Sequence, residues 1–169
     1  MSKSQWSLEE HIEVDAAPEE VHRVVSDVRN MGRWSPECRR VWVPRPPVRT
    51  GSRFVGFNRS GLFVWFTVCR VTALRAPAAS PDGSGEFTFD VAVFGLPIAR
   101  WGYRFEPAGE GTRVTEGWRD LRTGRSARLA GLLGSVFTGT KPERRIEVNR
   151  AGMRTTLARL AADFGRGAA

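Results

Sequence analysis

Five polar residues stand among bulky apolar residues in the middle of the chain: Asn58, Thr67, Tyr103, Glu116 and Asp120. The alternation of the surrounding segments places each of them on the same strand face as aromatic or aliphatic neighbours. Burying an amide or a hydroxyl without a partner costs about 1–3 kcal/mol, and a bare carboxylate costs far more. A sealed core would rarely carry this set, whereas a few polar groups among aromatic ones are typical of a small-molecule site. The pattern therefore favours a cavity.

Glu116 is the residue best suited to acid–base chemistry. Apolar surroundings raise the pKa of a carboxyl group toward neutrality, as general acid–base catalysis requires. Tyr103 or Asn58 could then donate a hydrogen bond to a carbonyl or enolate oxygen. No second titratable group is placed beside Glu116 by spacing, and both Glu116 and Asp120 could instead lie near sheet ends and pair with water or arginine. The sequence leaves open whether the protein is an enzyme, with Glu116 and Tyr103 as the catalytic candidates.

Other reactive residue types give no sign of a site. His11 faces away from the apolar side of its segment and His22 lies beside the apolar stripe of its helix, so we expect both at the surface. Cys38 and Cys69 have no metal-binding or redox spacing and are interpreted as packing residues in a reducing compartment. No Ser/His/Asp order, metal-ligand cluster or glycine-rich nucleotide loop stands out. We expect no metal and no cofactor.

The clearest alternation places Phe87, Phe89, Val91 and Val93 on one strand face, which we take as the inner face. Strand parity then extends this face to the neighbouring strands. Residues of the last helix and of the Trp34 region, which we expect at the entrance, complete the prediction. The ligand-binding candidates are Trp34, Asn58, Trp65, Thr67, Phe87, Phe89, Trp101, Tyr103, Glu116, Trp118, Asn149 and Met153.

These candidates depend on an α+β arrangement that the periodicity predicts. A helix begins at Pro18, and the helical region ends near Gly32. Consecutive strands joined by short turns, including a hairpin around residues 59–61, imply an antiparallel sheet with one covered face. The predicted strands are residues 8–14, 38–43, 51–58, 62–74, 86–94, 98–106 and 112–121.

The last long segment, residues 140–164, predicts a helix of roughly 36 Å that needs a large surface to pack against. Thr140 and Glu143 have the spacing of a capping box. An apolar stripe follows at helical spacing, formed by Ile146, Met153, Leu157, Leu160, Ala161 and Phe164. The preceding residues 122–139 are basic and then apolar, and are interpreted either as a short lid or as a plain connector.

The totals are those of one ordinary globular domain. The chain has 169 residues, of which 41% are hydrophobic and 26% charged. No apolar run reaches the roughly 20 residues that a transmembrane helix needs, and the first residues contain no signal-peptide core. We therefore expect a single cytoplasmic domain over residues 1–169, with its core at about 6–165.

The net charge of +8 is carried almost entirely by arginine, since all but two of the 26 basic residues are Arg. A nucleic-acid-binding protein would be expected to cluster its cations on one element, and here they are scattered through every segment. Nucleic acid is therefore not an expected partner. Both faces of residues 62–74 are apolar, which suggests that the outer one is buried in a homodimer.

Several motifs resemble the START/SRPBCC superfamily, in particular its polyketide cyclase/dehydrase-like branch. They are Ala17-Pro18-Glu19-Glu20-Val21, Ser26-Asp27-Val28, Arg33-Trp34-Ser35-Pro36, Phe54-x-Gly56-x-Asn58, Trp65-x-Thr67, Gly111-Thr112-Arg113-Val114-Thr115-Glu116 and Asn149…Gly152-Met153…Leu157. The resemblance implies a helix-grip fold, in which a curved antiparallel sheet of about seven strands wraps around a long C-terminal helix, with two short helices after the first strand. It also implies a cavity for lipids, sterols or polyketides, on which some members act as cyclases or dehydratases.

Three functions remain open from the sequence. The first is the binding of a small hydrophobic or aromatic ligand, such as a lipid or polyketide, between the sheet and the last helix. The second is a polyketide cyclase, aromatase or dehydratase that uses the same cavity. The third is an interaction module that uses the basic surface and residues 129–137 against a membrane or another anionic partner.

Overall fold

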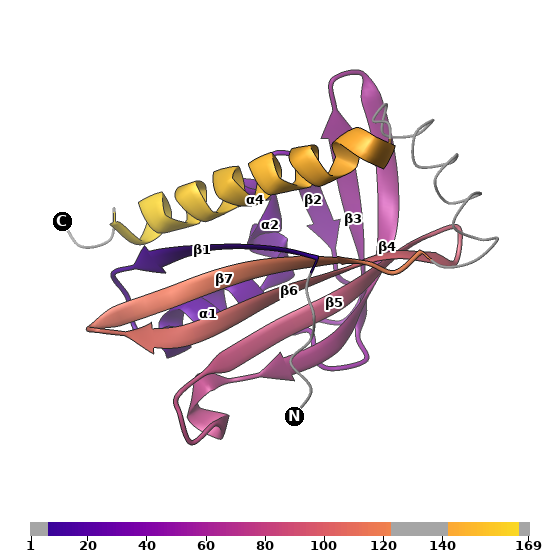
Figure 1. The fold of residues 1–169 in the computed structure, drawn as a ribbon. Helices are drawn as coiled ribbons and strands as arrows, with labels where there is room; N and C mark the ends of the chain where they lie inside the picture. Colours follow the sequence, from indigo (N-terminus) through magenta and orange to yellow (C-terminus); the bar gives the residue numbers. More distant parts are fainter. Residues whose placement is uncertain (1–6, 123–141, 166–169) are drawn as a thin grey trace.

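The computed structural model describes residues 7–122 and 142–165. In this part of the chain, a seven-stranded antiparallel sheet has the order β1-β7-β6-β5-β4-β3-β2. Figure 1 shows how the sheet curls, so that β2 to β4 run at a steep angle to β1, β7 and β6. The strands are β1 (Leu8–Val14), β2 (Cys38–Trp42), β3 (Arg53–Ser60), β4 (Phe63–Arg75), β5 (Gly85–Val93), β6 (Leu96–Ala108) and β7 (Gly111–Asp120).

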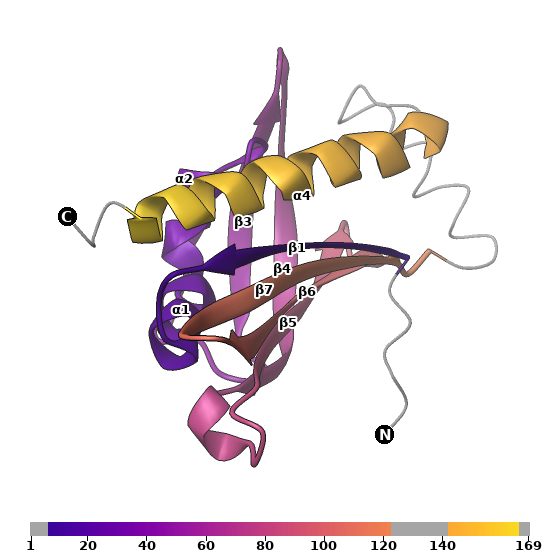
Figure 2. The ribbon, with the colours of Figure 1, turned by 60° about the vertical axis from the view of Figure 1, so that its left-hand side comes forward.

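Two groups of helices cover the inner face of this sheet. The helix α1 (Pro18–Ser26) is followed by a single 3₁₀ turn, η1 (Val28–Asn30), and by α2 (Met31–Trp34), and a second 3₁₀ turn, η2 (Pro77–Ala79), precedes β5. The long helix α4 (Pro142–Gly165) packs on β1 and β7 and meets α2 near its C-terminal end. Figure 2 shows α4 running the length of the molecule beside β1. The predicted helix-grip arrangement is confirmed.

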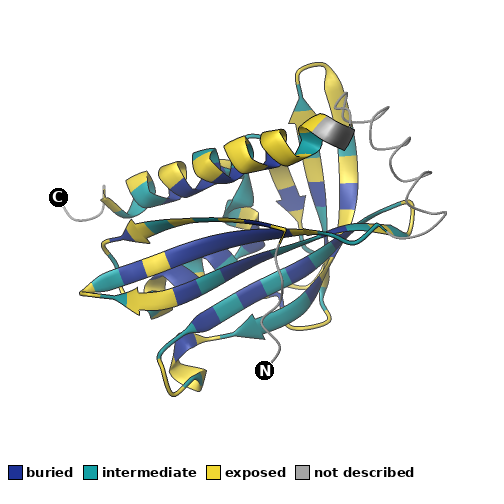
Figure 3. Cartoon of the chain, viewed as in Figure 1, coloured by how far each residue is buried: buried dark blue, intermediate teal, exposed yellow. Residues whose placement is uncertain are grey.

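Alternation along the strands explains which residues the sheet buries. On β5, Phe87, Phe89 and Val91 are buried while the residues between them are partly exposed, and Figure 3 shows the same alternation along several strands. The strand ends lie within two residues of the predicted ones. The hairpin prediction is slightly shifted, since β3 continues through Ser60 and the turn falls at Gly61, whose φ of +58° suits glycine.

The apolar stripe of α4 is shorter than predicted. Ile146 is 50% exposed, whereas Met153, Leu157 and Leu160 are buried. The reason is that the first turns of α4 face a cavity, bordered by Val148 and Asn149, rather than a packed core. The predicted capping residue Thr140, the side chain of Glu143 and, apart from Arg122, the segment 122–139 interpreted as a lid or a connector lie outside the described residues.

His22 is buried, and the prediction of a surface position is wrong. Its ring meets Phe105 edge to face, with the ring centres 5.3 Å apart, because α1 packs a wider face onto the sheet than its valines alone suggested. Burial lowers the pKa of His22, which keeps the imidazole neutral in the core. It lies among core residues and does not border the cavity. His11 is exposed, as expected.

Candidate ligand-binding site

A cavity of about 580 Å³ lies between the sheet and the first half of α4. Its walls come from β2 to β7, from the loop between α2 and β2, and from α4. Among the bordering residues, Arg39, Arg59, Gly61 and Ala151 are exposed, so the cavity opens between the β3–β4 hairpin and α4. This volume is within the range of about 300–1,000 Å³ that holds drug-sized ligands.

Glu116 and Tyr103 form a buried pair on the wall of the cavity. They are directly opposite each other on β7 and β6, and the Tyr103 hydroxyl donates a hydrogen bond of 2.8 Å to Oε1 of Glu116. The second carboxyl oxygen, Oε2, is buried and has no partner among the described residues. Glu116 therefore contributes to the cavity wall while one of its two oxygens has no hydrogen-bond partner among the described residues.

The interior environment shifts the acidity of both groups. Burial raises the pKa of Glu116 to about 8, although the hydrogen bond from Tyr103 acts in the opposite direction. Burial, with the neighbouring Glu116 as a second cause, also holds the pKa of the Tyr103 phenol well above its ordinary value. At neutral pH the carboxyl group is therefore protonated. Since Oε1 accepts from Tyr103, the proton is assigned to Oε2.

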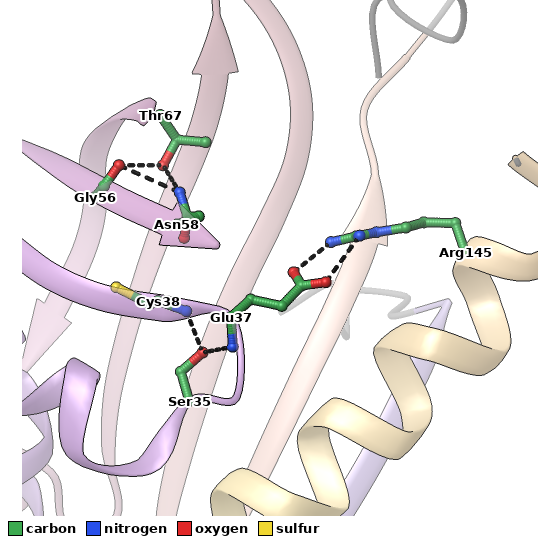
Figure 4. A network of polar contacts seen from close by, with 7 residues as sticks. All are labelled: Ser35, Glu37, Cys38, Gly56, Asn58, Thr67 and Arg145. Carbon is green, nitrogen blue, oxygen red and sulfur yellow. Dashed lines mark hydrogen bonds and ion pairs between the residues drawn. The ribbon is translucent and has the colours of Figure 1, made fainter. Parts of the chain in front are cut away.

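A second polar group lies on β3 and β4. The Asn58 side-chain amide donates to the backbone oxygen of Gly56 at 3.2 Å and to Thr67 Oγ1 at 3.3 Å (Figure 4). Glycine at position 56 suits this close packing, because a Cβ atom there would stand 3.1 Å from the Thr67 hydroxyl, closer than an ordinary van der Waals contact. These contacts satisfy the Asn58 and Thr67 donors and hold both side chains in fixed positions at the cavity wall.

An ion pair connects the two sides of the cavity. Arg145 on α4 donates two hydrogen bonds to the Glu37 carboxylate, at 3.1 and 2.8 Å, from the opposite side of the space shown in Figure 4. The loop that carries Glu37 is fixed by Ser35, whose hydroxyl oxygen accepts from the backbone N–H groups of Glu37 and Cys38. Sequence reasoning missed Glu37 and Arg145, because no local pattern pairs two charges more than a hundred residues apart.

All but two of the predicted ligand-binding residues border this cavity. Those that do are Asn58, Trp65, Thr67, Phe89, Trp101, Tyr103, Glu116, Trp118, Asn149 and Met153. They come from six elements, and the curl of the sheet brings them around one space. That they contact a ligand stays a prediction.

Trp34 itself does not border the cavity. Its indole N–H donates to Asp163 at 2.7 Å, and its backbone oxygen accepts from Arg159 at 3.2 Å. Both partners belong to the C-terminal part of α4, whereas the opening faces the N-terminal half. Trp34 is therefore a structural residue that fastens α4 to α2. The residues that follow it, from Ser35 to Arg39, do border the cavity.

Phe87 also lies outside the cavity wall. It is fully buried in the core cluster that includes Val21 of α1, and it stacks against Tyr103 with ring centres 6.4 Å apart. Strand parity correctly placed Phe87 on the inner face of β5. It did not predict that α1 covers this part of the sheet, whereas the space further along the sheet remains open.

Asp120 belongs to an ion pair and not to the interior. Arg122 Nε donates to its Oδ1 at 2.8 Å, and Asp120 does not border the cavity. Burial alone would raise the pKa of Asp120, but the hydrogen bonds from Arg122 outweigh it and lower the pKa. Within residues 7–122 and 142–165, no three His, Cys, Asp or Glu side chains gather as metal ligands do. No described helix is long and apolar enough to cross a membrane.

Solved structures share this fold. The STAR-related lipid transfer protein of Xanthomonas axonopodis is 16% identical, with a TM-score of 0.62 over 92% of this chain and 84% of that one. A polyketide cyclase-like protein of Corynebacterium glutamicum is 28% identical, with a TM-score of 0.52 over 93% and 87%. The di-domain aromatase/cyclase StfQ of the steffimycin pathway is 13% identical, with a TM-score of 0.66 over 96% of this chain and 51% of that one.

The comparison with protein families identifies the chain directly. No curated protein matches it. Residues 5–165 match the family described as polyketide cyclase/dehydrase and lipid transport, in agreement with the resemblance seen in the motifs. The match spans nearly the whole chain, and it includes every residue that borders the cavity. The chain belongs to the polyketide cyclase/dehydrase and lipid transport family.

Proposed function

We propose that this protein binds a small hydrophobic or aromatic molecule that carries an oxygen acceptor, such as a carbonyl group. The observation that carries the proposal is the buried Glu116–Tyr103 pair in the wall of a cavity that is otherwise mainly apolar and aromatic, with Oε2 of Glu116 left without a partner among the described residues. A buried polar atom without a partner costs free energy, so a ligand oxygen that accepts a hydrogen bond from Oε2 would gain affinity. Trp65, Trp101 and Phe89 would contact its apolar part.

The location of the ligand is tested by narrowing the opening. Ala151 is exposed and borders the cavity, so a tryptophan there fills the entrance without disturbing the core. Ala158 is exposed on the same helix but does not border the cavity, and Ala158→Trp is the matched control. Binding is followed by the change in intrinsic tryptophan fluorescence during titration with fatty acids and aromatic polyketides.

We expect Ala151→Trp to weaken binding at least tenfold and Ala158→Trp to leave it unchanged. Equal affinities in the two variants would place the ligand elsewhere. Failure of wild-type protein to bind any compound of either class, together with native mass spectra free of co-purified ligand, would refute the proposal.

The protonated Glu116 also favours a second function, that of a polyketide cyclase, aromatase or dehydratase. A neutral carboxyl group can donate its proton to a carbonyl oxygen during ring closure, or to a departing hydroxyl during dehydration. Glu116→Gln keeps a hydrogen-bond donor at this position but removes the transferable proton. If the protein is an enzyme of this class, the variant should bind substrate normally and lose about 10²–10⁴-fold in kcat. Unchanged turnover would remove Glu116 from the chemistry.

A further inference from the structure

The outer face of β2, β3 and β4 has an unusual charge composition. The three strands contain six arginines and neither aspartate nor glutamate. Arginine occurs along the whole sequence, whereas aspartate and glutamate are absent from these three strands. The fold places the three strands side by side at one end of the sheet. Arg75 pairs with Glu86 of β5, and the other five arginines make this part of the surface cationic.

The same face is also apolar. We call it the hairpin face and define it by the exposed residues Trp42, Phe57, Leu62, Val64, Phe66 and Val68. Phe57 is opposite Phe66 in the β3–β4 pairing, so their side chains lie next to each other on the outer surface. Leu62 at the hairpin turn is 92% exposed and Val64 is 68% exposed. The hairpin projects beyond α4 in both views of the fold (Figures 1 and 2).

Arginines border these apolar residues. Arg40 is paired with Phe57, Arg59 with Val64, and Arg53 with Arg70 at the far end of the face. None of these four arginines forms an ion pair with a described residue, and the Arg59 guanidinium donates to the backbone oxygen of Gly61. Their charges are available to an anionic partner.

We propose that the hairpin face docks on an anionic phospholipid bilayer. Leu62 and Val64 would enter the acyl region, and Arg40 and Arg59 would bind headgroup phosphates. A two-fold dimer through the same face would bring arginines against arginines with no acidic residue on the three strands to pair with them. The residues exposed most at the tip are aliphatic, which suits lipid better than the base-stacking surface of a nucleic-acid site.

Docking in this orientation places the cavity next to the membrane. Arg59, Ser60 and Gly61 belong to the hairpin and also border the cavity opening. A hydrophobic ligand could then pass between bilayer and cavity with little exposure to water. This last step rests on the proposed function, whereas the docking itself does not.

The test is co-sedimentation with vesicles of phosphatidylcholine alone or with 30% phosphatidylserine. We expect binding only to the anionic vesicles, and weaker binding as salt is raised. Arg40→Gln combined with Arg59→Gln should lower the partition coefficient by roughly fivefold per arginine, the equivalent of about 1 kcal/mol each. Arg119→Gln, at an exposed position on β7, is the matched control and should change it little.

Val64→Glu tests the apolar part and should reduce binding more than tenfold, while Ala78→Glu in η2, at the opposite end of the molecule, should leave it intact. Equal binding to both vesicle types, or to neither, would overturn the proposal. So would a dimer in light scattering that Val64→Glu dissociates, or tighter binding to single-stranded DNA. Ligand titrations of the wild-type protein and of Val64→Glu, whose site does not border the cavity, separate the two proposals, because a failed docking with normal ligand affinity contradicts only the docking.

Discussion

Replacing Glu116 with glutamine removes one titrating group from the interior and changes almost nothing else. The glutamine oxygen can accept the hydrogen bond that Tyr103 donates to Oε1, and the amide takes the place of the protonated Oε2 beside the cavity. Side-chain volume is conserved. At pH 4, where the carboxyl group is mostly protonated in the folded and the unfolded chain, we expect the two proteins to have similar free energies of unfolding.

The difference develops as the pH rises. The pKa of Glu116 is about 8 in the folded protein against 4.5 for the ordinary group. Between these values the folded chain keeps a proton that the unfolded chain has released, so the free energy of unfolding falls with pH. The stabilisation is fully present below pH 4.5 and is lost as the pH rises through 8. At about 1.4 kcal/mol per pH unit, the wild-type protein loses about 4 kcal/mol between pH 4 and pH 8 through this one group.

Urea unfolding, followed by tryptophan fluorescence at intervals from pH 4 to pH 8, measures the effect. All other groups titrate in both proteins, so the difference between them isolates Glu116. We expect Glu116→Gln to become more stable than wild type by about 4 kcal/mol at pH 8. Parallel stability curves for the two proteins would refute a protonated Glu116.

Glu10→Gln is the control of opposite sign. Burial by itself raises the pKa of Glu10, but hydrogen bonds from Arg154 and Arg150 outweigh it and lower the pKa. The stabilisation from Glu10 is therefore present above its ordinary pKa and is lost as the pH falls. Its replacement should destabilise the protein at pH 7 and have less effect toward pH 3.

Two further predictions follow from contacts away from the Glu116 pair. Trp34→Phe removes the hydrogen bond to Asp163, so the free energy of unfolding measured in urea should fall by about 1–3 kcal/mol while ligand affinity stays unchanged. Weaker ligand binding at full stability would contradict the structural role. Burial raises the pKa of Cys38 to about 11 and that of Cys69 to about 12. Both thiols should therefore react with a disulfide reagent at pH 8 far more slowly in native than in urea-unfolded protein. Equal rates would show that the thiols are accessible.

The fold could be predicted from the sequence because its strands alternate clearly and its motifs are distinctive. Alternation assigned Tyr103 and Glu116 to one face, but their direct pairing depends on the register between β6 and β7, which spacing alone did not give. It could not predict how far along each strand the packed core ends, which is why Phe87 was placed in the cavity. That boundary depends on where α1 lies against the sheet, and tertiary contacts decide this position.

Long-range polar contacts were the other part that the sequence could not supply. The Glu37–Arg145 ion pair joins a loop to a helix from the other end of the chain. The hydrogen bond of Trp34 could not be predicted for the same reason, since its partner Asp163 lies on the last turns of α4. An indole N–H and a carboxylate carry no local signal of their pairing, whereas an apolar stripe does.

The cavity is a consequence of how α4 is attached. Toward its C-terminal end, α4 is held by Trp34 and by the buried residues Leu157 and Leu160, which pack into the core. Its first half reaches across toward the opposite strands, where the Arg145–Glu37 pair is its polar connection to the loop before β2. The wall beneath it includes small residues, notably Gly56, which cannot span such a gap. Close packing at one end and a side-chain bridge at the other leave a space that the aromatic walls border but do not fill.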